Sequence, residues 1–407
     1  MKKILDPRKF LVAGMAAFLC LGVMNTWSIL KVPLQTEFGW TAAQLSLNFT
    51  ISFSFFCIGG WLGSRLTKFF PHKAVLLGAA AAILIGEWMT SHVTESRLFY
   101  LYLGNGVLCG LGIGTAYNVI ISLLYPWFPG RTGICSGLLM MAYGVSSLLL
   151  GTLAETLISM ESFGWKNTFL SFGLIMAAAL FAAAHILRLP KEGEVKPPKA
   201  IEDRTARSYT SAEMLRSPKF YLLFFSLVCI AAIGNSFFSF LRDYAVSLGF
   251  STATAAALVG LCSVCNGIGR VLCGLSFDRA GWRVVMPVVA ILAIISAALA
   301  LLAVSAGLSW LAVITICLMG ASFGCCPVIS MSATSAFFGP KHYSETLGIQ
   351  NFNLMGASFC ASVSGLLITR EGDFVSALYF LLGLGVVALL LIFVLKALKE
   401  EKISSAE

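Results

Sequence analysis

Apolar runs of about 20 residues or more recur along the whole chain and are separated mostly by short polar connections. A run of this length crosses the hydrocarbon core of a bilayer as an α-helix. The pattern therefore predicts an all-α integral membrane protein with twelve transmembrane helices. We expect the spans at residues 10–31, 43–64, 73–91, 98–125, 132–158, 167–188, 219–241, 252–277, 284–305, 309–337, 344–369 and 374–396.

Lysine and arginine are distributed unevenly over the connections between these spans. One side of the predicted topology carries 22 of the 28 cations and the other side carries 5, and Arg270 falls within a span. Positive residues concentrate in cytoplasmic loops, so we expect both termini in the cytoplasm. The net charge of +9 then reflects topology and attraction to anionic lipid, and we expect no nucleic-acid partner.

Composition narrows the function classes. With 58% hydrophobic and 12% charged residues, the chain is too poor in charge for a soluble protein. The 12 cysteines fall mostly within apolar runs without nearby histidines, so we interpret them as packing thiols and predict no metal site. No nucleotide-binding loop and no nucleophile–base constellation is found, so we predict neither an enzyme nor a bound cofactor.

A long polar stretch divides the spans six and six. We place a cytoplasmic linker at 189–217, an N-terminal half at 1–188 and a C-terminal half at 218–407. Within the linker, Thr210 and Glu213 have the spacing of a capping box that opens a short helix. The two halves repeat weakly and in the same direction, which is the arrangement of major facilitator transporters.

Arg270 is a lone cation inside an apolar run. A centred arginine costs about 2.5–3.5 kcal/mol on insertion scales, so it needs a partner, water or a ligand. We predict that it receives the anionic group of a substrate, with Asn266 one turn earlier orienting it or sharing the ligand. The alternatives are snorkelling to the headgroups and a purely structural pairing.

A glycine-rich charged motif follows Arg270 where the run ends. Its residues are Gly274, Asp278, Arg279, Gly281 and Arg283. Gly274 permits a close helix contact, and Asp278 can accept hydrogen bonds from a neighbouring helix N-terminus or pair with the arginines. We predict a gate on the cytoplasmic side; a loop that merely obeys the positive-inside rule would explain the cations but not the other residues.

Further polar residues fall within the predicted spans. We expect Glu87, near the outer end of its span, to be interfacial, with proton coupling as the alternative. The remaining ones either form hydrogen bonds between helices or line a pocket. For the cluster at 350–353 we favour a pocket lining. The candidates for substrate contact are Asn25, Tyr117, Tyr143 and Asn351.

Three segments together carry a family resemblance. They are the Trp-Phe-Pro-Gly-Arg131 turn with its following glycines, Glu213-Met-Leu-Arg216-Ser-Pro218, and the run from Arg270 to Gly281. The chain resembles the oxalate/formate antiporter family, relatives of the monocarboxylate transporters, over nearly its whole length. This resemblance implies a transporter that holds its anion on an arginine and a lysine within an aromatic cage.

The resemblance implies roles for individual residues. The family's arginine matches Arg270, and its cage tyrosines match Tyr117 and Tyr143. Its lysine falls on Leu354, and of the other cage positions only Phe323 stays aromatic. Since two carboxylates against one cation would leave an uncompensated charge, we expect a monocarboxylate rather than oxalate.

The sequence thus predicts a secondary transporter of a small organic anion that works by alternating access, coupled by proton symport or anion exchange. We expect a monomer in the cytoplasmic membrane of a prokaryote, with the lipid bilayer and a small carboxylate as its partners. The alternatives are a neutral substrate with a structural Arg270, and a solute sensor on a transporter fold.

Overall fold

The computed structural model describes residues 7–191, 193–195 and 208–398. Of the predicted linker, residues 192 and 196–207 lie outside this part of the chain. Within the described part of the chain, twelve helical stretches are long and apolar enough to cross a membrane. The prediction of an all-helical, twelve-span protein is therefore confirmed.

The chain forms two compact units by its backbone contacts. Unit 1 comprises Met1–Arg131, Leu138–Ile201 and Leu347–Phe352, and unit 2 comprises Thr132–Gly137, Glu202–Thr346 and Asn353–Glu407. Two short segments are thus grouped with the unit formed by the other half of the sequence.

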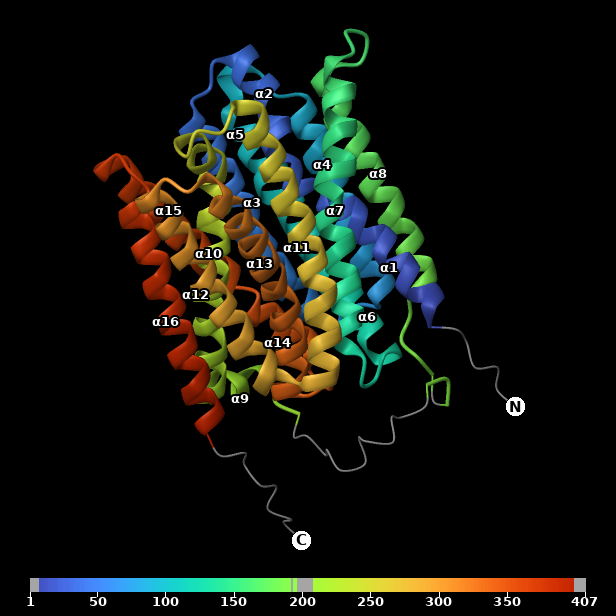
Figure 1. Ribbon diagram of the computed structural model, residues 1–407. Coiled ribbons are helices and arrows are strands. Elements are labelled where there is room, and N and C mark those ends of the chain that lie inside the picture. The colour runs from blue at the N-terminus through green and yellow to red at the C-terminus, as the bar shows by residue number, and fades with distance from the viewer. Residues whose placement is uncertain (1–6, 192, 196–207, 399–407) are drawn as a thin grey trace. The chain divides into compact units, whose positions relative to one another are not determined.

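The helices of the first half of the chain make up most of unit 1. They are α1 (Arg8–Leu21), η1 (Gly22–Thr26), α2 (Trp27–Phe38), α3 (Ala42–Leu66), α4 (His72–Ser91), η2 (Glu95–Arg97), α5 (Leu98–Leu101), η3 (Tyr102–Cys109), α6 (Gly110–Leu124), η4 (Tyr125–Trp127), α7 (Thr132–Ser159) and α8 (Gly164–Ile186). Helices α4 and α8 run side by side, and α3 packs along α6 (Figure 1).

The second half holds the helices of unit 2. They are α9 (Ser211–Arg216), α10 (Pro218–Ser247), α11 (Thr252–Ala280), α12 (Trp282–Ala306), α13 (Ser309–Phe338), α14 (Tyr343–Gln350), α15 (Asn353–Glu371) and α16 (Val375–Ala397). Helices α11 and α13 form the most extensive pair, and α10 packs against α13, α15 and α16. Helix α9 begins with the predicted capping box, in which Thr210 and Glu213 bond each other's backbone.

Three of the predicted spans are irregular inside. The first contains the 3₁₀ segment η1 and continues to Phe38, beyond its predicted end at 31. The fourth contains the π-helical segment η3. The eleventh, expected as one helix over 344–369, is interrupted between α14 and α15 at Asn351 and Phe352. Irregular backbone at membrane depth is found where it is buried in protein or lines a cavity.

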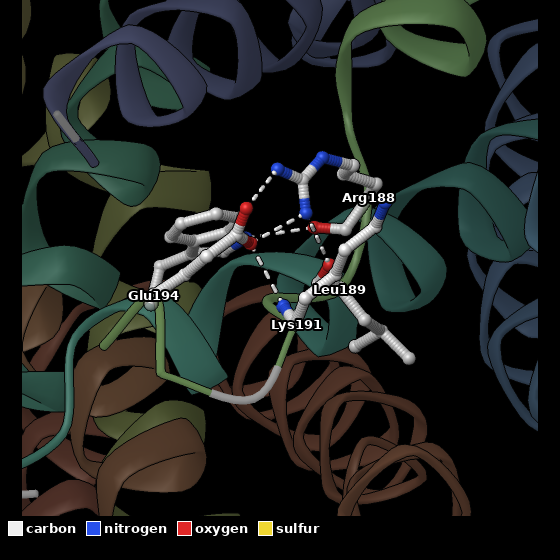
Figure 2. A network of polar contacts seen from close by, with 5 residues as sticks. Arg188, Leu189, Lys191 and Glu194 are labelled. Atoms are coloured by element: carbon white, nitrogen blue, oxygen red, sulfur yellow. Dashed lines mark hydrogen bonds and ion pairs between the residues drawn. The ribbon is translucent and has the colours of Figure 1, made fainter. Parts of the chain in front are cut away.

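A polar network fixes the start of the linker. Arg188 donates two parallel hydrogen bonds to the carboxylate of Glu194, at 2.7 and 2.8 Å, and Lys191 donates its backbone N–H to the same group (Figure 2). The Trp127 indole donates to the carbonyl oxygen of Arg188 at 2.7 Å, and its ring lies under the guanidinium. The hydrogen bonds from Arg188 lower the pKa of Glu194 to about 2.

Candidate functional site

An aromatic cluster in unit 1 contains both predicted tyrosines. The Tyr117 ring on α6 lies 6.0 Å from the Tyr143 ring on α7, and each also contacts Phe18. Phe56 of α3 packs edge-on against Tyr117 at 5.0 Å. Tyr117 is 4% exposed, while Tyr143 is half-buried. The structure thus brings the two predicted tyrosines together beside Phe18 and Phe56, which the sequence analysis did not name.

Asn25 lies beside this wall. It belongs to the 3₁₀ segment η1, and its side-chain amide donates to the backbone oxygen of Tyr143 at 3.4 Å. The Tyr143 hydroxyl in turn points at the sulfur of Met24, 3.9 Å away. The 3₁₀ segment of the first span therefore places Asn25 next to Tyr143, at the edge of the aromatic cluster.

Unit 2 carries the predicted cation. Arg270 lies on α11 and is half-buried, and Asn266, one turn earlier, is 6% exposed. Helix α13 approaches α11 so closely here that a side chain at Gly324 would overlap the backbone oxygen of Asn266. The neighbouring Phe323 is half-buried, and its ring packs against Phe238 at 5.5 Å. Arg270, Asn266 and Phe323 thus belong to one tightly packed helix pair.

The interruption between α14 and α15 coincides with the polar cluster that the sequence singled out. Gln350 is fully buried, yet neither polar atom of its side-chain amide has a hydrogen-bond partner among the described residues. The side-chain nitrogen of Asn351 is likewise without a partner there, whereas the Asn353 amide donates to the Ser330 hydroxyl at 3.3 Å. Buried amides that lack partners are costly, which makes this break a candidate for ligand contact.

The predicted gate motif binds a helix N-terminus. Asp278 accepts the backbone N–H of Gly133 at 2.7 Å and that of Ile134 at 2.8 Å, both in the first turn of α7. A helix N-terminus carries unpaired N–H groups and partial positive charge, so a carboxylate is well placed there. Gly274 lets the two backbones meet, because any side chain would overlap the carbonyl oxygen of Gly133.

The other members of the motif end the helix. Gly281 follows the last residue of α11 with a φ of +72°, a conformation that favours glycine. Arg279 and Arg283 are exposed, and the guanidinium of Arg283 lies over the ring of Trp282 at 5.5 Å. The motif thus joins an anchored carboxylate to a sharp helix end, and its gating role stays a prediction.

Glu87 is enclosed by protein, while its depth in the membrane stays a prediction. Its side chain is 2% exposed, and Oε1 accepts a hydrogen bond from the Asn105 amide at 3.3 Å. Asn105 in turn accepts from Asn48 at 2.8 Å. Sequence reasoning missed Asn105, although an asparagine inside an apolar run was a visible signal. The π-helical segment η3, which could not be read from the sequence, brings it to Glu87.

No group of three or more His, Cys, Asp or Glu residues that could hold a metal ion occurs in the part of the chain that the structure describes. The cysteines are free thiols there. The candidate residues are thus phenol and amide groups and a buried carboxyl group in unit 1, and a guanidinium and an amide in unit 2.

Comparison with known proteins finds membrane transporters among the relatives of this chain. The chain is 25% identical to the uncharacterized MFS-type transporter YhjX of Escherichia coli over 84% of its length and 83% of that protein. It is 25% identical to the oxalate:formate antiporter of Oxalobacter formigenes over 85% of its length and 81% of the relative. Monocarboxylate transporter 12 of Rattus norvegicus matches at 25% identity over 62% of the chain and 56% of that protein.

The fold also matches solved structures. The proton:xylose symporter XylE superposes with a TM-score of 0.77 over 95% of both chains, at 14% sequence identity. The family model of the Major Facilitator Superfamily matches residues 12–355. The resemblance to the oxalate/formate branch is thus confirmed by its relatives, which are transporters and not enzymes. The chain belongs to the Major Facilitator Superfamily.

Proposed function

We propose that this multi-pass membrane transporter carries a small organic monocarboxylate by alternating access. Arg270 binds the carboxylate, and Tyr117 and Tyr143 donate hydrogen bonds or wall the pocket. The amides of Asn25, Asn266 and Asn351 hold hydroxyl or carbonyl groups of the substrate. Arg270 carries the proposal, because it is the one Lys or Arg that the sequence places deep within a span. Similarity to the oxalate:formate antiporter and to monocarboxylate transporter 12 supports the substrate class.

One positive charge favours one carboxylate. A guanidinium presents a planar fork that matches a carboxylate with two parallel hydrogen bonds. The position at which the resemblance implies a second cation is occupied by Leu354. A dicarboxylate would therefore bring one charge without a partner into a site of low polarity, at a cost of several kcal/mol. We thus propose that formate-like or lactate-like ions are carried in preference to oxalate.

The membrane and the orientation follow from the charge pattern. We propose that the chain lies in the cytoplasmic membrane of a prokaryote with both termini inside, because the cations concentrate on that side of the predicted topology. The driving force is a gradient of protons or of a counter-anion. The gate at Asp278 closes the cytoplasmic side by holding the first turn of α7.

Ligand-dependent thermal unfolding of the purified full-length protein tests the substrate class. Formate, lactate, oxalate and neutral lactamide are compared at equal concentration; a ligand at 100 times its Kd raises stability by about 2.7 kcal/mol. We expect stabilisation by the two monocarboxylates and a loss of that stabilisation in Arg270→Lys, which keeps the charge but not the fork. Arg242→Lys, at an exposed position of α10, is the matched control. Stabilisation by the neutral amide alone, or an unchanged response of Arg270→Lys, would refute the proposal.

A further inference from the structure

Glu87 is a buried carboxyl group with one occupied and one open oxygen. Oε1 accepts from the Asn105 amide at 3.3 Å, and Oε2 is buried without a hydrogen-bond partner among the described residues. Asn105 is itself held from two sides, since Asn48 donates to its side-chain oxygen at 2.8 Å and the Ser52 hydroxyl donates to its backbone oxygen at 3.2 Å. The chain of amides thus fixes one carboxyl oxygen and leaves the other available.

A small hollow adjoins this carboxyl group. The volume open to the centre of a water molecule is about 20 Å³, which is enough to hold one water. The hollow is lined in part by Glu87, Asn105 and Ser52. The remaining lining from η1, α2, α3, η3 and α6 is apolar apart from a thiol, and none of the described lining residues is lysine, arginine or histidine. The hollow therefore offers polar contact and room for water, but no cation.

The groups that face Glu87 come from several helices. From η3 they are the Asn105 amide and the Cys109 thiol, which lies within hydrogen-bond reach of the carboxyl group and also donates to the backbone oxygen of Ile83 at 3.6 Å. Helix α8 presents Gly173, at which a methyl group would lie 2.8 Å from Cβ of Glu87. Segments η1 and α2 contribute Met24 and Trp27 to the same hollow. The thiol is the one other titratable group among these facing residues.

Burying a carboxylate without a positive partner is expensive, so a cation must accompany the charge. Hard metal ions require about six oxygen ligands. Here the side-chain oxygen of Asn105 already accepts a hydrogen bond, and the Ser52 hydroxyl already donates one to the backbone oxygen of Asn105, so the hollow offers too few oxygen ligands for such an ion. The free oxygen of Glu87 beside a water-sized space suits a proton better, because a proton needs one oxygen and one water to deliver it.

We propose that Glu87 is a proton-binding site of this transporter. A hydronium ion in the hollow passes its proton to Oε2, which forms the O–H bond and leaves a water molecule, and the reverse transfer releases the proton. Asn105 is the positioning residue, because it holds Oε1 and thereby leaves Oε2 to take the proton. This inference deepens the proposed function: it makes carboxylate transport a proton symport, and it rests on that function only for the coupling.

The proton site is tested first without any substrate. Infrared spectroscopy of the full-length protein in lipid should show a carbonyl stretch of a protonated carboxylic acid that is lost in Glu87→Gln and kept in Glu155→Gln, a matched change at an exposed carboxylate of α7. In the wild-type protein, dicyclohexylcarbodiimide, which modifies protonated carboxyl groups in membranes, should label the peptide that contains Glu87. A band that survives in Glu87→Gln, or the absence of labelling at Glu87 at every pH, would overturn the proposal.

Coupling is tested in proteoliposomes with labelled lactate. Glu87→Gln keeps the shape of the protonated side chain, so exchange of labelled for unlabelled lactate should persist at close to the wild-type rate. Uptake driven by an inward proton gradient should fall to the level without a gradient, while Glu155→Gln remains like wild type. Undiminished gradient-driven uptake by Glu87→Gln, or stimulation by sodium in place of protons, would overturn the proposal. If wild type carries no monocarboxylate, the proposed function fails, and the spectroscopic and labelling results still decide on Glu87.

Discussion

Replacing Asp278 by alanine removes the carboxylate that holds the first turn of α7 to α11. The structure gives it hydrogen bonds of 2.7 and 2.8 Å from two backbone N–H groups. A hydrogen bond to a charged group contributes about 1.5–3 kcal/mol, and water replaces part of this at a half-buried position. We therefore expect the anchored turn to lose about 2–3 kcal/mol relative to the wild-type protein.

Cys135 reports this loss directly. Its thiol is 0% exposed and lies one residue beyond Ile134, so it reacts with a maleimide only when the turn opens. Since 1.4 kcal/mol corresponds to a factor of ten, labelling should be about 30- to 140-fold faster in Asp278→Ala. The assay measures labelling of each cysteine-containing peptide by mass spectrometry in native membranes.

Two controls limit the interpretation. Cys20, a half-buried thiol in unit 1, should react at the same rate in both proteins. Asp243→Ala removes an exposed carboxylate from α10 and should leave Cys135 protected. The carboxylate does not hold the turn closed if Cys135 is labelled no faster in Asp278→Ala than in wild type. The same conclusion follows if the labelling rate of Cys135 rises equally in Asp243→Ala.

Three further changes probe other parts of the structure. Gly324→Val should lower the unfolding temperature strongly, because its side chain would overlap α11 backbone, whereas Gly267→Ala, with open space around it, should change the stability by at most about 1 kcal/mol. Thr210→Ala removes the cap of α9 at a cost of about 1 kcal/mol, seen as faster amide hydrogen exchange in that helix only. Because the pKa of Glu194 is lowered to about 2, its ion pair with Arg188 is fully formed at pH values above the ordinary pKa of a glutamate. The ion pair is lost only as the pH falls toward 2. Glu194→Gln should therefore speed tryptic cleavage of this loop at every pH at which trypsin acts, and an unchanged rate would contradict the network.

The sequence predicted the fold because long apolar runs have few other outcomes in a membrane. The interruptions within the spans were not predictable in the same way, since hydropathy averages over about 19 residues and does not report which backbone groups bond each other. The polar cluster at 350–353 marked one of these breaks by composition. The 3₁₀ turn at Asn25 and the π-helical segment before α6 gave no comparable signal.

The candidate site shows the same division. Arg270 and the tyrosines stood out because charged and polar groups are rare within spans. For Glu87, the position along α4 was readable from the sequence, but its hydrogen-bond partner was not. Asn105 lies on another helix, and only the packing of η3 against α4 shows that the carboxyl group is enclosed by protein. Long-range pairing of polar groups is a property of the assembled structure that one sequence does not state.

Because η3 is a π-helix, the number of residues in this segment decides which side chains face α4 as much as their identity does. A π-helix bonds each residue to the fifth one along, whereas an α-helix bonds to the fourth. Deleting one residue between Leu101 and Gly110 would let the segment wind as a regular α-helix and would change the direction in which its side chains point. The amide would then leave the carboxyl group although no polar side chain had been replaced. We thus expect a homologue that is one residue shorter in this stretch to transport its substrate without proton coupling, whatever residues line its pocket.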